Sequence, residues 1–114
     1  MEPRTEDAID ELARRTTEGV DIGGTSRQGT VTASREELRL QFGEPDTGYP
    51  KSTYHWQVRF ADGTVATIYD YYGSNRHVGK EEDVEWSVGG RSEDAVELLQ
   101  FLGLDAETVE MAAA

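Results

Sequence analysis

The chain has 114 residues, enough for one small domain, and its 36% hydrophobic content suffices for a core of its own. It has no cysteine, which excludes disulfides and thiolate metal sites, and no apolar run long enough to cross a membrane. Its 23 acidic and 11 basic residues give a net charge of −12, which disfavours direct nucleic-acid binding because a phosphate-binding surface must be basic. The polar, acidic start differs from a secretory signal, so we expect a cytoplasmic protein.

Three explanations of the acidity are open. An acidic surface can imitate a nucleic-acid backbone and occupy the basic groove of a partner protein. It can also be ordinary solubility charge. Finally, it can be an adaptation to concentrated salt, because Lys51 and Lys80 are the only lysines among the basic residues, a pattern that resembles haloarchaeal proteins.

The first predicted element is a helix over residues 6–18, with Thr5 as its N-cap and Gly19 at its end. The next stretch, 20–29, contains three glycines and predicts a loop, followed by a short strand. We therefore expect an N-terminal segment over residues 1–30 and a single domain over residues 31–114.

A capping box predicts the start of a second helix. Ser34 can accept a hydrogen bond from the amide of Glu37, whose side chain can reach back. Leu38 and Phe42 lie four residues apart, and with Leu40 beside them they predict a short helix with one apolar face. Gly43 permits a left-handed C-cap that ends it.

Three strands are predicted next. Residues 53–60 alternate strictly between apolar and polar, with Trp56 on the apolar face. Residues 64–72 are apolar on both faces, which is typical of a central strand, and residues 84–88 alternate around Trp86. We expect the two tryptophan-bearing strands to flank the tyrosine-rich strand and to pack their indoles against the C-terminal helix.

The C-terminal part predicts a helix over residues 93–102, capped by Ser92, and a last short helical turn that begins at Asp105. Together these elements predict an α+β fold, an antiparallel sheet of three to four strands with helices packed on one face.

The catalytic motifs that we searched for are absent, so we expect a protein that is not an enzyme and has no cofactor. His55 and His77 have no metal-binding spacing, and the polar face of its strand predicts a solvated His55. The acidic run Glu81, Glu82 and Asp83 lacks the spacing of a calcium loop, so no metal site is expected.

Two groups of residues are candidate binding sites. The first is a protein-binding surface, because exposed tyrosines are frequent interface anchors and acids attract a basic partner. It comprises Tyr71, Tyr72, Glu81, Glu82 and Asp83.

The second candidate is a small-ligand site. Glycines allow close approach to the backbone, amides at a helix N-terminus attract anions, and arginine suits phosphate, while tyrosine can stack on a base. This site comprises Tyr69, Arg76, Gly89, Gly90 and Arg91. A plain strand-to-helix turn and packing tyrosines remain the alternative interpretation.

About half of the chain resembles a group of small proteins encoded by tailed phages, archaeal viruses and prophages. The motifs are TASREELRLQFGEP, WQVRFADGTVATIYDYY and EWSVGG, within residues 32–90. The resemblance implies a viral or mobile-element accessory protein that acts inside the host cell, and it assigns a role to no residue.

These observations lead to three hypotheses about function. The first is an intracellular inhibitor of a host or defence protein with a basic surface, a counter-defence role in which nucleic-acid mimicry is one form. The second is a small-ligand binder that sequesters a nucleotide-like signal, and the third is a virion structural component. Exposed sheet edges also allow a homo-oligomer.

Overall fold

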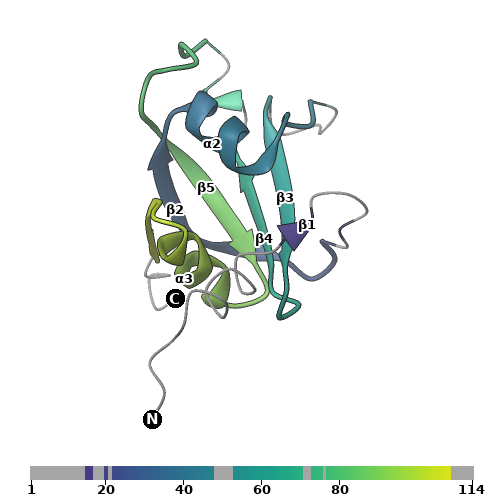
Figure 1. Cartoon of the computed structure of the whole chain (residues 1–114). Coiled ribbons are helices and arrows are strands. Elements are labelled where there is room, and N and C mark those ends of the chain that lie inside the picture. Colours follow the sequence, from purple (N-terminus) through teal and green to yellow (C-terminus); the bar gives the residue numbers. More distant parts are fainter. Residues whose placement is uncertain are drawn as a thin grey trace, which may run out of the picture.

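The computed structural model describes residues 15–16, 20, 22–47, 53–70, 73–75 and 77–108. All of its strands belong to one antiparallel sheet in the order β1-β3-β4-β5-β2-β6 (Figure 1). The elements are β1 (Arg15–Thr16), β2 (Ser26–Ala33), α2 (Arg35–Phe42), β3 (His55–Phe60), β4 (Val65–Tyr69), β5 (Val84–Gly90), α3 (Asp94–Phe101) and β6 (Asp105–Thr108).

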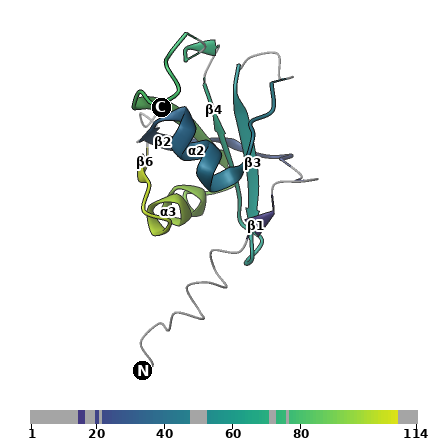
Figure 2. The same cartoon turned by 45° about the horizontal axis from the view of Figure 1, so that its top comes forward.

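Helices α2 and α3 cover the same face of the sheet, so the molecule has two layers (Figures 1 and 2). The core lies between these layers, and the sheet contributes alternate residues to it because strand side chains point to opposite faces. The largest fully buried side chains include Trp86, Leu38, Ile68, Leu99, Val31 and Val58. The predicted α+β fold is therefore confirmed.

The predicted number of strands was too low. Five strands have four residues or more, and the two-residue β1 adds a sixth at one edge. The predicted loop over residues 20–29 is wrong from Ser26 onward, because β2 begins there and pairs with both β5 and β6. Strand β2 also runs through residue 30, so residues 26–30 belong to the sheet.

Two predicted helical segments are strands. The helical turn expected after Asp105 is strand β6, which pairs with β2. Arg15–Thr16 was expected inside the first helix and instead pairs with β3, while the rest of that predicted helix lies outside the described residues. In both segments, pairing with a neighbouring strand overrides the local preference for a helix.

The two tryptophans hold helix α2 onto the sheet. Strands β3 and β5 flank β4 as predicted, and the rings of Trp56 and Trp86 meet edge to face with centroids 5.3 Å apart. The indole of Trp86 donates to the carbonyl of Ala33 at 2.9 Å, and that of Trp56 donates to the carbonyl of Gly43 at 2.8 Å. Because these carbonyls lie at the two ends of α2, both indole hydrogen bonds anchor α2. The two indoles also belong to the same core cluster as the buried residues of the C-terminal helix α3.

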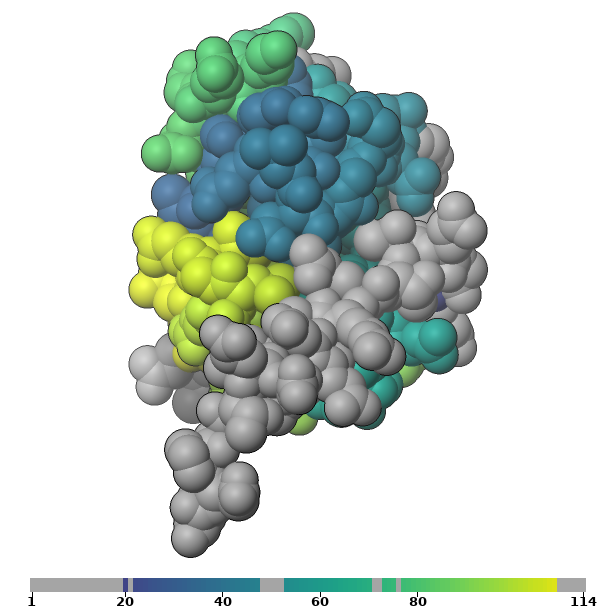
Figure 3. All heavy atoms as spheres, in the orientation of Figure 1, coloured from purple at the N-terminus to yellow at the C-terminus, as the bar shows by residue number. Residues whose placement is uncertain are grey.

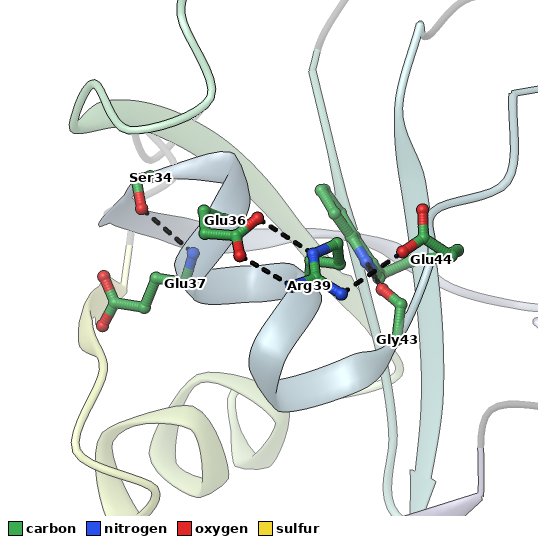
Figure 4. Close-up of polar contacts among 7 residues, drawn as sticks. Ser34, Glu36, Glu37, Arg39, Gly43 and Glu44 are labelled. Carbon is green, nitrogen blue, oxygen red and sulfur yellow. Dashed lines mark hydrogen bonds and ion pairs between the residues drawn. The ribbon is translucent and has the colours of Figure 1, made fainter.

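Ser34 and Gly43 bound α2 as the sequence analysis predicts, but the carboxylate of Glu37 points away from the N-cap instead of reaching back to it (Figure 4). Ser34 Oγ accepts from the amide of Glu37 at 3.0 Å, and Gly43 ends the helix with a φ of +89° (Figure 4). On the helix surface Arg39 pairs with Glu36 at 2.6 Å and with Glu44 at 3.5 Å (Figure 4). These contacts fix the start and end of α2 on the outer side of the helical layer.

Helix α3 packs closely on the sheet because Gly90 has no side chain. A Cβ atom at Gly90 would lie 2.6 Å from Cβ of Ala95, too close for two carbon atoms. The helix begins one residue later than predicted, with Glu93 at its N-cap, while Ser92 Oγ accepts from the amide of Asp94.

Candidate functional site

The outer side of the helical layer carries the two large hydrophobic residues that stand out as exposed in the described chain. Leu40 on α2 is 72% exposed, and Phe101 on α3 is 36% exposed. Figure 3 shows this side of the molecule, with α2, the loop before β5 and the C-terminal elements on one continuous surface. A leucine that faces solvent contributes little to the core, so it is available to a partner.

The elements on this side also carry many exposed carboxylates. The exposed acids of α2, of the loop before β5 and of the start of α3 are Glu37, Glu44, Glu81, Glu82, Asp83, Glu93, Asp94 and Glu97. We call these eight acids, Leu40 and Phe101 the acidic helical surface. Its charge is opposite to that of a basic partner, and its two apolar side chains supply contact area.

The predicted acids Glu81, Glu82 and Asp83 lie in an exposed loop that is attached to α2. The amide of Glu36 in the first turn of α2 donates to the carbonyl of Lys80 at 2.9 Å. This bond joins two acidic segments that are far apart in the sequence. The predicted Tyr71, Tyr72 and Arg76 lie outside the described residues, so their role stays a prediction.

The start of the β4–β5 connection is held by a buried carboxylate. Asp70 is fully buried, and its Oδ1 accepts from the amides of Thr53 and Tyr54, both at 2.8 Å. Its Oδ2 accepts from the amide of Asn75 at 3.3 Å, and the side chain of Asn75 donates to the carbonyl of Glu85 at 3.0 Å. Asp70 is therefore a structural residue that fixes where the connection leaves the sheet.

Further along, the same connection contacts the start of α2. The guanidinium of Arg35 donates to the hydroxyl of Tyr54 at 2.6 Å and to the carbonyl of Val78 at 3.5 Å. Its carbon centre also lies 4.6 Å from the centroid of the Tyr54 ring. Both ends of the connection are thus fixed to the domain, which keeps the acidic loop in place next to α2.

The outer face of the sheet, opposite the helices, is polar and partly buried. The prediction that His55 is solvated is wrong, because it is only 7% exposed and stacks on Tyr69 with ring centroids 6.0 Å apart. Burial lowers the pKa of His55, and the nearby charge of Asp46 opposes this shift. Burial likewise raises the pKa of Tyr69, against the opposing positive charge of Arg27.

Gly89 and Gly90, which we predicted to cradle a ligand, are the last two residues of β5. A Cβ atom at Gly89 would lie 2.4 Å from Thr67 Oγ1. The space left by the missing side chains of these two glycines is therefore filled by Thr67 and Ala95, and not by a ligand. Arg91 is exposed and donates to the carbonyl of Gly23 at 2.9 Å. The structure brings Tyr69 near Gly89, and the ligand-binding role of this group stays a prediction.

A cleft of about 260 Å³ opens on the outer face of the sheet. Its lining residues come from β2, from β5 and from the β4–β5 connection, and they are Arg27, Ser74, Glu85, Trp86 and Ser87. Sequence reasoning missed this cleft, because strand pairing brings Arg27 next to Gly89 across 62 residues of chain.

Strand β6 forms one edge of the sheet, where we expected a site for self-association. The amide of Ala106 donates to the carbonyl of Leu104 at 3.0 Å, and the carbonyl of Ala106 accepts from Gln100 Nε2 at 2.7 Å. Both backbone groups of this residue are thus bonded within the protein. The charged Asp105 and Glu107 on either side also discourage pairing with another strand.

Neither helix of the described chain has the length and apolar content of a membrane span. Within the same residues, no three His, Cys, Asp or Glu side chains converge as metal ligands would. Comparison of the chain with protein-family models, with curated proteins and with solved structures found no match.

Proposed function

We propose that this protein is a non-enzymatic interaction protein that binds a basic partner protein through the acidic helical surface. The observation that carries the proposal is the 72% exposure of Leu40 in the last turn of α2, with the exposed carboxylates of Glu37 and Glu44 on either side of it in sequence. A leucine held in water is an available binding anchor, since burying its side chain gains about 1.5–3 kcal/mol. The surrounding acids steer a positively charged partner toward it.

The more specific form of the proposal is an inhibitor of a host or defence protein, acting inside the host cell. The resemblance to viral accessory proteins and the net charge of −12 support this form. If the partner binds nucleic acid, the acidic helical surface occupies its basic groove in place of phosphates. The alternatives of a nucleotide-like ligand and of a virion component stay predictions.

The test is quantitative capture from host lysate with variants of the full chain. Leu40→Ser removes the anchor, and we expect recovery of the partner to fall about tenfold or more, from the lost burial of one leucine. Reversal of Glu81, Glu82 and Asp83 to lysine should slow binding and reduce its dependence on salt. The matched control is Glu107→Lys, which reverses an exposed acid on β6 outside this surface.

Two results would contradict the proposal. One is equal capture by the Leu40→Ser variant and the unmodified protein. The other is a loss of capture by Glu107→Lys as large as that caused by reversal of the loop acids, since binding would then depend on net charge and not on this surface.

A further inference from the structure

The cleft on the outer face of the sheet brings two opposite charges to one small volume. Arg27 and Glu85 both line it, together with Ser74 and Ser87. We propose that this cleft binds a small zwitterion, whose carboxylate meets Arg27 and whose ammonium group meets Glu85. The site is on the opposite face from the acidic helical surface, so it is independent of the proposed function.

The register of the strands sets the distance between the two charges. Arg27 pairs with Gly89, which lies four residues after Glu85 on β5, so the two backbones are about 13 Å apart along the strand. In the described part of the chain, the ion pairs within 4.0 Å are those of Arg39, so Arg27 and Glu85 do not neutralise each other. Both charges therefore remain available to a ligand that bridges them.

Two of the residues that line the cleft, Ser74 and Ser87, have backbones that are held in place before any ligand binds. Ser87 is only 7% exposed and lies on β5 between its two hydrogen-bonded neighbours in the sheet. Ser74 lies between Gly73 and Asn75, whose amides donate to the carbonyl and the carboxylate of Asp70. The backbone around these two residues therefore loses little conformational entropy when a ligand enters, whereas the exposed side chains of Arg27 and Glu85 become ordered on binding.

Charge favours a zwitterion over an anion. A nucleotide phosphate could meet Arg27, but it would also meet the carboxylate of Glu85 and the field of a protein with a net charge of −12. A zwitterion has no net charge, so it enters that field without a net repulsion. Each of its charged groups then gains a charge-assisted hydrogen bond.

The volume of the cleft limits the ligand to a small molecule. Its 260 Å³ equals about nine water molecules at roughly 30 Å³ each. An α-amino acid carries its two charges on adjacent carbons, whereas backbones about 13 Å apart favour a ligand whose charges are further apart. A short ω-amino acid places them several ångströms apart and fits the volume.

The test is a titration of the full chain with glycine, 4-aminobutyrate and 6-aminohexanoate, followed by amide chemical shifts in ¹H–¹⁵N spectra. We expect saturable shifts at Ser74, Glu85 and Ser87, with tighter binding for one of the two longer compounds than for glycine. Butyrate and butylamine each carry one of the two charges, and they should bind at least about fivefold more weakly than 4-aminobutyrate.

Variants identify the two charged contacts. Arg27→Gln and Glu85→Gln should each weaken binding of the best zwitterion about fivefold or more, while Arg59→Gln changes an exposed arginine outside the cleft and should leave it unchanged. The proposal is overturned if none of the three compounds gives saturable shifts at the cleft. It is also overturned if butylamine binds as well as 4-aminobutyrate, or if Arg59→Gln weakens binding as much as Arg27→Gln.

Discussion

Replacing Asp70 by alanine should make the protein unfold at a much lower urea concentration. The Asp70 carboxylate is fully buried and accepts hydrogen bonds from three backbone amides, at 2.8, 2.8 and 3.3 Å. Alanine leaves these three donors without their acceptor, and each such group costs about 1–3 kcal/mol. Because water enters part of the space, we expect the free energy of unfolding to fall by about 3–5 kcal/mol.

Equilibrium urea unfolding followed by far-ultraviolet circular dichroism measures this loss. The matched control is Asp62→Ala, because Asp62 accepts from only one amide, that of Thr64 at 2.9 Å, in an exposed turn. That variant should lose about 1 kcal/mol or less. Asp70→Asn keeps one acceptor oxygen and should lie between the two, which provides a measurable loss if Asp70→Ala does not fold. Equal losses for Asp70→Ala and Asp62→Ala would refute the reasoning.

Three further predictions concern pH, self-association and packing. Burial holds the pKa of His55 below its ordinary 6.5, so on acidification the unfolded chain binds this proton before the folded chain does. The free energy of unfolding should therefore decline below about pH 6.5, as a falling urea midpoint. The variant His55→Gln should flatten this decline, and an unchanged slope would contradict the prediction. Gln100→Ala removes the hydrogen bond to the carbonyl of Ala106 at the sheet edge, so the variant should self-associate more than the unmodified protein. Light scattering measures this, and a molar mass that stays that of a monomer at every concentration would contradict the prediction. Gly90→Ala overpacks against Ala95 and should lower the unfolding free energy by about 1–3 kcal/mol, a loss that the double variant with Ala95→Gly should partly recover.

The parts of the fold that follow from local patterns were predictable. The alternation of apolar and polar residues around Trp56 predicted strand β3, because successive side chains of a half-buried strand point to opposite faces of the sheet. The N-cap signal at Ser34 and the glycine at position 43 located α2 to within a residue, since both signals act over only a few positions.

The parts that depend on distant pairing were not predictable. The first half of β2 has no apolar residue, and it is a strand because β5 pairs with it from Ser26 onward. Asp105 has the chemistry of a helix cap but starts β6 for the same reason. His55 was expected in water, because the sequence does not show that the ring of Tyr69 lies over it.

The candidate sites differ in the same way. Leu40 lies two residues from the buried Leu38, on the opposite side of a helix with 3.6 residues per turn, so its exposure could have been deduced from spacing. The cleft could not have been deduced in this way, because Arg27 and Glu85 come to line the same cleft only when β2 pairs with β5.

The two tryptophans are the only ones in the chain, and both donate to carbonyls at the ends of α2. The intrinsic ultraviolet emission of the protein therefore originates beneath the helix that presents Leu40. Any molecule that shifts α2 on docking will alter the environment of both fluorophores at once, which provides a label-free optical signal for the arrival of a partner.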